Sequence, residues 1–186
     1  LDNVTVQWCI ISEGLNNSIH SKGKHSFGSL VRGSYGAKYS FHHNLFAHNS
    51  GRNPRPGNYN SNSSTLDPLG LQFDFRNNVV YNWGGSYPSY DSDTDSVCRM
   101  NYVNNYFKAG PNSSYGNVYV ASSRQFMGYF AGNYFDGGIP SNPYSLIYFG
   151  NWSPAEIEKW IQSEPFSTGP MVTQSAQDAC ASVLSH

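Results

Sequence analysis

The chain has 186 residues, of which 12% are charged and 16% aromatic, and its formal net charge is −1. This length suffices for one domain with a full core, and the many Gly, Ser, Asn and Tyr residues favour short strands over helices. Apolar runs fall far short of the roughly 20 residues of a membrane-spanning helix, and no motif or charge balance indicates nucleic-acid binding.

A short motif recurs along the chain. It consists of a short apolar strand, then one key residue that is usually polar, and then a pair of aliphatic or aromatic residues. The key positions are Cys9, Asn44, Asn78, Asn105 and Asn133, at intervals of 35, 34, 27 and 28 residues. This spacing predicts an all-β chain wound as a parallel β-helix. Asn tolerates the left-handed turn, and stacked amides can bond to one another, so we expect an asparagine ladder. Cys9 is expected in the same column as a buried free thiol.

The remaining strand patterns follow in chain order. They occupy 4–11, 30–32, 38–46, 71–81, 99–107, 117–121, 125–134 and 146–148. Two long segments between them, 49–66 and 84–96, are predicted to be loops. Such loops often carry binding residues because the coil stack supplies a rigid support.

The pattern changes near the end of the chain. A Ser-Pro-Ala-Glu capping box predicts a helix over 154–163, and a second short helix is expected over 175–184. Both should lie against the flank or the end of the stack. We therefore predict β-helix coils over 1–150 and a helical extension of the same domain over 151–186.

The positive charges are concentrated in one window, residues 14–66, which contains no Asp or Glu. The window holds six of the eleven Lys and Arg residues and five of the six histidines. Its basic residues are Lys22, Lys24, Arg32, Lys38, Arg52, Arg55, His20, His25, His42, His43 and His48. A patch of one sign indicates an anionic ligand, and an extended polycarboxylate suits arginine. Lys38 is interpreted as solvated, whereas prolines stiffen the loop that presents Arg52 and Arg55.

Two local patterns resemble metal sites, and neither is favoured. Asp91, Asp93 and Asp95 begin like a calcium loop, but the expected Gly and Glu are missing from its sixth and twelfth positions. We interpret this segment as a solvated acidic turn. His42 and His43 are adjacent on a strand, so we expect one at the groove or ladder and the other in the core.

The strand Phe-His-His-Asn-Leu-Phe over 41–46, followed by Arg-Asn-Pro-Arg over 52–55, resembles the pectate lyase superfamily of polysaccharide lyases. The likeness extends roughly from residue 2 to residue 135. It implies a right-handed parallel β-helix, secreted from the cell, that cleaves polygalacturonate by β-elimination with calcium as cofactor.

By the same resemblance, Arg52 matches the base that removes the proton from the carbon next to the uronate carboxylate. Pro54 matches the residue that holds this loop, and Arg55 is expected to bind a substrate carboxylate because the family's second arginine falls on Gly57. The other candidates for substrate binding are Lys22, Lys24, His25 and His42. A guanidinium base implies an alkaline pH optimum, since it loses its proton only above a pH of about 12 in water.

The family's acidic calcium ligands lie mainly on coils that would precede Leu1. We therefore expect the calcium ligands upstream of Leu1 and interpret the chain as a processed or partial product of a longer precursor. We also expect the strand over 4–11 to pair with a coil from the N-terminal portion of the same β-helix, carried on a separate chain.

Three alternatives stay open at this point. A non-catalytic β-helix that binds acidic glycans would share the fold and the basic window. A pectin lyase would act on methylated substrate without a metal. A polygalacturonase would need clustered carboxylates for acid–base hydrolysis, and residues 14–66 contain none.

Overall fold

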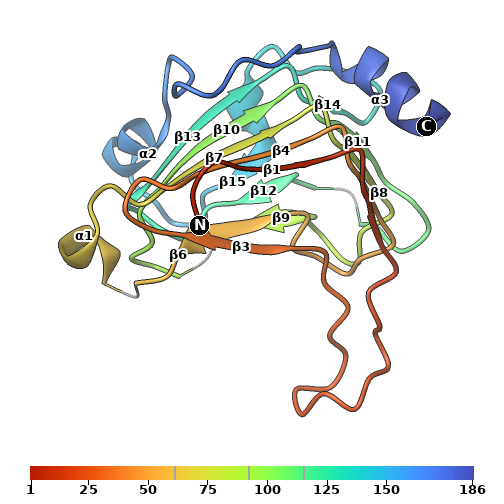
Figure 1. Ribbon diagram of the computed structural model, residues 1–186, viewed down its shortest axis with the longest axis horizontal. Helices are drawn as coiled ribbons and strands as arrows, with labels where there is room; N and C mark the ends of the chain where they lie inside the picture. Colours follow the sequence, from red (N-terminus) through yellow and green to blue (C-terminus); the bar gives the residue numbers. More distant parts are fainter. Residues whose placement is uncertain (61, 92, 115) are drawn as a thin grey trace.

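The computed structural model describes residues 1–60, 62–91, 93–114 and 116–186 (Figure 1). Its strands stack in parallel along three faces of a coiled chain, which confirms the parallel β-helix. No helix in the described part of the chain is long and apolar enough to cross a membrane.

The first two faces carry five-stranded sheets. The first sheet has the order β1 (Val4–Gln7), β4 (Lys38–His42), β7 (Leu71–Arg76), β10 (Cys98–Val103) and β13 (Phe126–Ala131). The second has the order β14 (Tyr134–Phe135), β11 (Tyr106–Lys108), β8 (Val79–Tyr81), β5 (Leu45–Ala47) and β2 (Ile10–Ser12). β1 and β2 lie at sheet edges, and the expected pairing with a further coil stays a prediction.

The third face carries two shorter sheets. One pairs β3 (Leu30–Gly33) with β6 (Arg55–Asn58), and the other has the order β15 (Ile147–Tyr148), β12 (Tyr119–Val120) and β9 (Ser89–Tyr90). β6 and β9 fall inside the two segments predicted as loops, so that prediction is wrong there. Pro, Gly and Asn obscure the strand pattern of β6, and a two-residue strand leaves no alternation to detect.

Each long predicted strand is in fact two strands joined by a sharp bend, and the asparagine ladder lies directly after this bend. The backbone N–H of Asn44, Asn78 and Asn105 donates to the side-chain oxygen of the next ladder asparagine, at 3.0 Å in each case. Their Nδ2 groups donate to the same oxygens at 2.9–3.1 Å. The buried amides therefore satisfy one another, as the spacing predicts.

Two details of the ladder differ from the prediction. The left-handed residues stand one position earlier, with φ of 51–63° at Trp8, His43, Asn77, Asn104 and Gly132. This column turns the chain, which leaves the ladder amides free to bond along the stack. The Cys9 thiol is exposed instead of buried, although the Cys9 N–H does donate to Asn44 at 3.1 Å.

Aromatic side chains fill the core in register on four successive coils, after Val6 on the first. Phe41, Phe75, Tyr102 and Phe130 occupy equivalent positions on neighbouring strands of the first sheet. The ring centroid of Tyr102 lies 5.1 Å from that of Phe75 and 4.7 Å from that of Phe130. Full burial of one such side chain stabilises the fold by about 1.5–3 kcal/mol.

The two predicted C-terminal helices are confirmed as α2 (Pro154–Trp160) and α3 (Ala176–Ser185), with the predicted capping box at the start of α2. The remaining helices are the short α1 (Ser63–Leu66) and the 3₁₀ turn η1 (Pro143–Leu146). Trp160 of α2 fills the space above Gly128, where a Cβ atom would meet its ring at 2.4 Å. α2 therefore covers the last strand of the first sheet.

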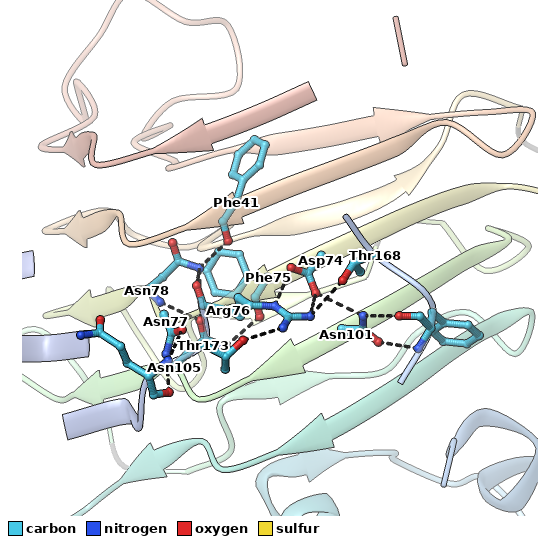
Figure 2. A network of polar contacts seen from close by, with 12 residues as sticks. Phe41, Asp74, Phe75, Arg76, Asn77, Asn78, Asn101, Asn105, Thr168 and Thr173 are labelled. Atoms are coloured by element: carbon cyan, nitrogen blue, oxygen red, sulfur yellow. Dashed lines mark hydrogen bonds and ion pairs between the residues drawn. The ribbon is translucent and has the colours of Figure 1, made fainter. Parts of the chain in front are cut away.

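Residues 165–175, here called the C-terminal strap, run along the first sheet between α2 and α3 (Figure 1). Asn101 receives a hydrogen bond from the Phe166 N–H and donates one to its carbonyl oxygen, both at 2.9 Å. Arg76 donates to Thr173 at 2.9 Å (Figure 2). Side chains of the sheet thus fasten the strap at both ends.

Gln174 of the strap contacts three successive coils through the left-handed column. Its side-chain oxygen lies 2.8 Å from Nε2 of His43, and its carbonyl oxygen accepts from Asn77 and Asn104, both at 2.8 Å. His42 and His43 do not separate to opposite faces, because their Nδ1 atoms lie 2.9 Å apart. The left-handed backbone at His43, with φ 54°, breaks the strand alternation on which that prediction rests.

Candidate functional site

Arg52 occupies the turn that leads from the second face to β6. Its φ of 57° lies in the left-handed region, which costs a non-glycine residue about 1–3 kcal/mol and often marks a functional site. Backbone hydrogen bonds hold the turn from both sides. The Ser29 N–H donates to the Arg52 carbonyl at 2.7 Å, and the Asn53 N–H donates to the Pro88 carbonyl at 2.9 Å.

Aromatic groups hold the Arg52 side chain. Its guanidinium carbon lies 4.0 Å from the centroid of the Phe27 ring, in a cation–π contact. Its Nε–H donates to the Tyr90 hydroxyl at 3.2 Å. Arg52 is therefore oriented without a carboxylate partner among the described residues.

Two further arginines belong to this part of the molecule: Arg55 begins β6, directly after the turn of Arg52, and Arg32 lies on the neighbouring strand β3. In the pairing of β3 with β6, Arg55 stands opposite Leu30 and Arg32 stands opposite Gly57. Because Arg55 and Gly57 are two positions apart on one strand, Arg32 and Arg55 share a face. The guanidinium carbon of Arg55 lies 5.1 Å from the centroid of Tyr90, so Tyr90 contacts both Arg52 and Arg55.

Asp93 faces both arginines of this pair. Its carboxylate oxygens lie 2.7 Å from Nη2 of Arg32 and 3.7 Å from Nη2 of Arg55. The Asp93 side chain is 45% exposed, whereas those of Arg32 and Arg55 are 29% and 20% exposed. The carboxylate therefore lies outside the arginines, on the solvent side.

Asp91 behaves differently from Asp93 and is fully buried. Burial raises its pKa to about 8, although the N–H groups of Ser122 and Ser123 donate to it at 2.8 and 2.9 Å. Burial therefore favours the uncharged form of Asp91. The predicted solvated acidic turn is wrong for Asp91, which is inside the protein, whereas Asp93 is exposed as predicted but paired with arginine, and Asp95 accepts a hydrogen bond from Ser64 at 2.9 Å.

Residues 13–29 form a loop that projects from the stack between β2 and β3 (Figure 1). Lys22 and Lys24 are exposed on it. His25 stacks on His20 with ring centroids 4.1 Å apart and meets the edge of Phe27 at 4.6 Å. Desolvation, and then the neighbouring positive groups His20, Arg52 and Lys22, lower the pKa of His25. Of the three loop candidates, His25 is the one whose ring contacts the Arg52 cluster.

The other predicted site residues take separate places. Pro54 is buried next to Arg52, in the turn that leads into β6. His42 lies beside the C-terminal strap, where burial and then His43 lower its pKa. Lys38 is exposed at the start of β4, as predicted. The structure therefore brings together Arg52, Pro54, Arg55 and His25, while His42 belongs to another cluster.

Arg32, Phe27, Tyr90 and Asp93 complete the site, and their roles in it are not predicted from the sequence. Arg32 is visible there only as one member of the basic window. The one signal for Asp93 is its place among three alternating aspartates, and that pattern gives no hint of an arginine partner 61 residues away.

The described residues do not fit a calcium site. Among them no group of three or more His, Cys, Asp or Glu side chains could hold a metal ion. Of the three aspartates over 91–95, Asp91 is buried with a raised pKa, Asp93 pairs with Arg32, and Asp95 accepts a hydrogen bond from Ser64. What the arrangement offers instead is two guanidinium groups, Arg32 and Arg55, around the exposed carboxylate of Asp93, with Arg52 joined to Arg55 through Tyr90, and this suits an anionic ligand.

No family model matches the chain. It is 34% identical over 134 residues to the probable pectate lyase C of Neosartorya fischeri and 36% identical over 136 residues to that of Aspergillus terreus. It is also 34% identical over 137 residues to the probable pectate lyase C of Emericella nidulans.

These alignments cover 72–73% of this chain and 26% of each relative, so the chain spans about a quarter of the length of the curated relatives it matches. The matched stretch is long enough to include most of the stacked coils. This likeness agrees with the parallel β-helix, and the chain is therefore similar to one part of these probable pectate lyases.

Proposed function

We propose that the chain supplies the base and part of the substrate site of a polysaccharide lyase that cleaves polygalacturonate by β-elimination. The observation that carries this proposal is the turn of Arg52. A strained backbone aims one guanidinium group between Phe27 and Tyr90, next to Arg55. Structural arginines are usually saturated by carboxylates or carbonyl groups, and this one is not saturated by a carboxylate of the described residues.

In this mechanism Arg52, in its neutral form, takes the proton from the carbon next to the uronate carboxylate. The electron pair of that C–H bond forms a carbon–carbon double bond as the neighbouring glycosidic C–O bond breaks. The leaving oxygen takes a proton from solvent. Negative charge develops on the uronate carboxylate in the transition state, and the cationic groups beside Arg52 stabilise it.

The pH dependence follows from the identity of the base. A guanidinium group is neutral only at high pH, so product formation is expected to rise toward alkaline pH. A tyrosine hydroxyl and an aromatic ring are better neighbours for a base than a carboxylate, because they stabilise the charged form of Arg52 less than a full negative charge would.

Calcium dependence is a separate part of the proposal, and it comes from the resemblance alone. Because the described residues do not fit a calcium site, no step above passes through the metal. Loss of turnover with a chelator and recovery with added calcium would support the requirement. Full turnover after exhaustive chelation would favour a pectin lyase, which acts on methylated substrate without a metal.

Secretion and a second polypeptide complete the proposal. A polymer of galacturonate is too large to enter a cell, so an enzyme for it should act outside. The N-terminal portion of the β-helix, on a separate chain, is the proposed partner of β1. Immunoblotting of culture medium and the masses of the purified protein's chains test these two points.

The deciding experiment is Arg52→Lys in the whole natural protein that contains this chain. Polygalacturonate is the substrate, and absorbance in the near ultraviolet reports unsaturated uronides. We expect product to fall by at least about a hundredfold, while binding of the polymer persists because lysine keeps the charge. Arg124→Lys is the matched control, since Arg124 is exposed and pairs with Glu156 of α2.

Two results would contradict the proposal. Polymer binding without product in the unaltered protein would favour the non-catalytic glycan-binding alternative. Equal product from Arg52→Lys and the unaltered protein would remove Arg52 from the chemistry.

A further inference from the structure

Arg32 and Arg55 form a two-armed fork around one carboxylate. They come from different strands, β3 and β6, and the register places them on one face of the sheet. The carboxylate between them belongs to Asp93, which follows β9 and reaches the fork from a third coil. Nothing in the resemblance gives Arg32 or Asp93 a role.

The hold of the fork on Asp93 is uneven. Arg32 lies at hydrogen-bond distance, 2.7 Å, but the 3.7 Å from Arg55 is too long for a hydrogen bond. Nε of Arg55 is buried and has no hydrogen-bond partner among the described residues. Arg55 therefore keeps donor capacity that Asp93 does not use.

Asp93 is also easy to replace. Its side chain is 45% exposed, and exposed ion pairs contribute little to stability because water screens them and both side chains lose freedom. Moving it away from the fork leaves the arginines to a different carboxylate at small cost. A ligand with several carboxylates gains more than Asp93 does, because each of its carboxylates can pair with a different cation of the site.

The fork lies beside the proposed base. The Tyr90 ring contacts the guanidinium group of Arg55, and the Tyr90 hydroxyl accepts the hydrogen bond from Arg52. The uronate held by the fork is therefore either the sugar that loses its proton to Arg52 or the next sugar along the polysaccharide. Asp91 is fully buried, and its burial favours the uncharged form of its carboxyl group.

We propose that the fork of Arg32 and Arg55 binds a uronate carboxylate of an acidic polysaccharide, and that Asp93 occupies the fork when the polymer is absent. The polymer class rests on the proposed function. A free carboxylate can take the place of Asp93 between the arginines, whereas a methyl ester carries no charge and leaves Asp93 in the fork. The fork therefore selects unesterified over methyl-esterified polymer.

The test is calorimetric binding of short oligogalacturonates to the whole natural protein, in the unesterified and the fully methyl-esterified forms. Asp93→Asn removes the competing charge and should tighten binding of the unesterified form by about twofold to fivefold. Binding of the methyl ester should not change. Asp95→Asn is the matched control, since Asp95 bonds to Ser64 and contacts neither arginine in the described structure.

A second variant keeps the proposal testable if Asp93→Asn does not fold. Arg32→Gln removes one arm of the fork and should weaken binding of the unesterified oligomer by about tenfold, with little effect on the methyl ester. Equal effects of Arg32→Gln on both forms, or weaker binding of the unesterified form by a folded Asp93→Asn variant, would overturn the proposal.

Binding and turnover separate this inference from the proposed function. Tighter binding by Asp93→Asn in a protein that forms no unsaturated product would support the fork and refute the lyase. Product formation with unchanged binding in the Asp93→Asn variant would refute the fork and leave the lyase standing.

Discussion

Arginines on two faces of the coil stack have opposite surroundings. Arg76 on β7 pairs with Asp74 through Nε at 2.7 Å and Nη2 at 2.5 Å, and it also donates to Thr173 (Figure 2). Arg52 and Arg55, by contrast, lie on aromatic rings, and of these two only Arg55 has a carboxylate, the exposed one of Asp93, within 4 Å among the described residues. A saturated arginine fastens the C-terminal strap, whereas the unsaturated ones keep donors for a ligand.

Burial also separates the structural arginine Arg76 from the arginines of the candidate site. The Arg76 side chain is 12% exposed and that of Asp74 is 2% exposed, so each charge depends on the other for its solvation. Around Arg52, the aromatic rings hold the guanidinium groups without neutralising them. Removing an arginine should therefore affect stability on one face and chemistry on the other.

The largest expected difference compares Arg76→Met with Arg52→Met. Arg76→Met leaves the buried carboxylate of Asp74 without its charge partner and should cost about 3–5 kcal/mol of unfolding free energy. Arg52→Met should cost less than about 1 kcal/mol. Urea unfolding of both variants measures this. A loss for Arg52→Met as large as that for Arg76→Met would remove the distinction between the two faces.

A smaller effect is expected for Tyr90→Phe. This change keeps the ring under Arg55 but removes the hydroxyl that accepts from Arg52. The turnover number should fall by about threefold to tenfold, with KM nearly unchanged. Tyr87→Phe is the control, because Tyr87 is exposed and only touches the edge of Tyr90. An unchanged turnover number would show that Tyr90 does not position the base.

The smallest expected effect is on how the unfolding free energy depends on pH, and it concerns His42 beside the C-terminal strap. The folded protein lowers the pKa of His42, mainly through burial, below the value of about 6.5 that the unfolded chain has. The unfolded chain therefore binds more protons as pH falls below about 6.5, and unfolding free energy should fall with it. In His42→Gln this part of the slope should disappear. An identical pH slope in the variant would show that another group causes it.

The coil stack could be predicted because its signal is local. Every ladder asparagine stands beside an apolar pair, and this pattern repeats with each coil. The one-residue shift of the left-handed position could not be seen, since Asn is common at both positions and tolerates either conformation. β6 and β9 were hidden because their pairing, and not their composition, makes them strands.

The residues of the candidate site likewise fall into those that a local sequence motif predicts and those that only the fold brings together. Arg52, Pro54 and Arg55 follow from one short motif. Arg32 and Asp93 meet through the register of strands from different coils, 61 residues apart, and no local pattern carries that information. The prediction that His42 and His43 point to opposite faces is wrong for a local reason, because the left-handed backbone at His43 breaks the alternation of a regular strand.

Gln174 gives the stack a property that the ladder alone does not provide. Coils that touch only their neighbours form a nearly one-dimensional array, which can open from one end, unit by unit. Gln174 bonds to His43, Asn77 and Asn104, which belong to three successive coils. Opening any one of these coils strains its contact with the same residue. The amides of the three coils should therefore exchange their hydrogens with solvent as one cooperative unit.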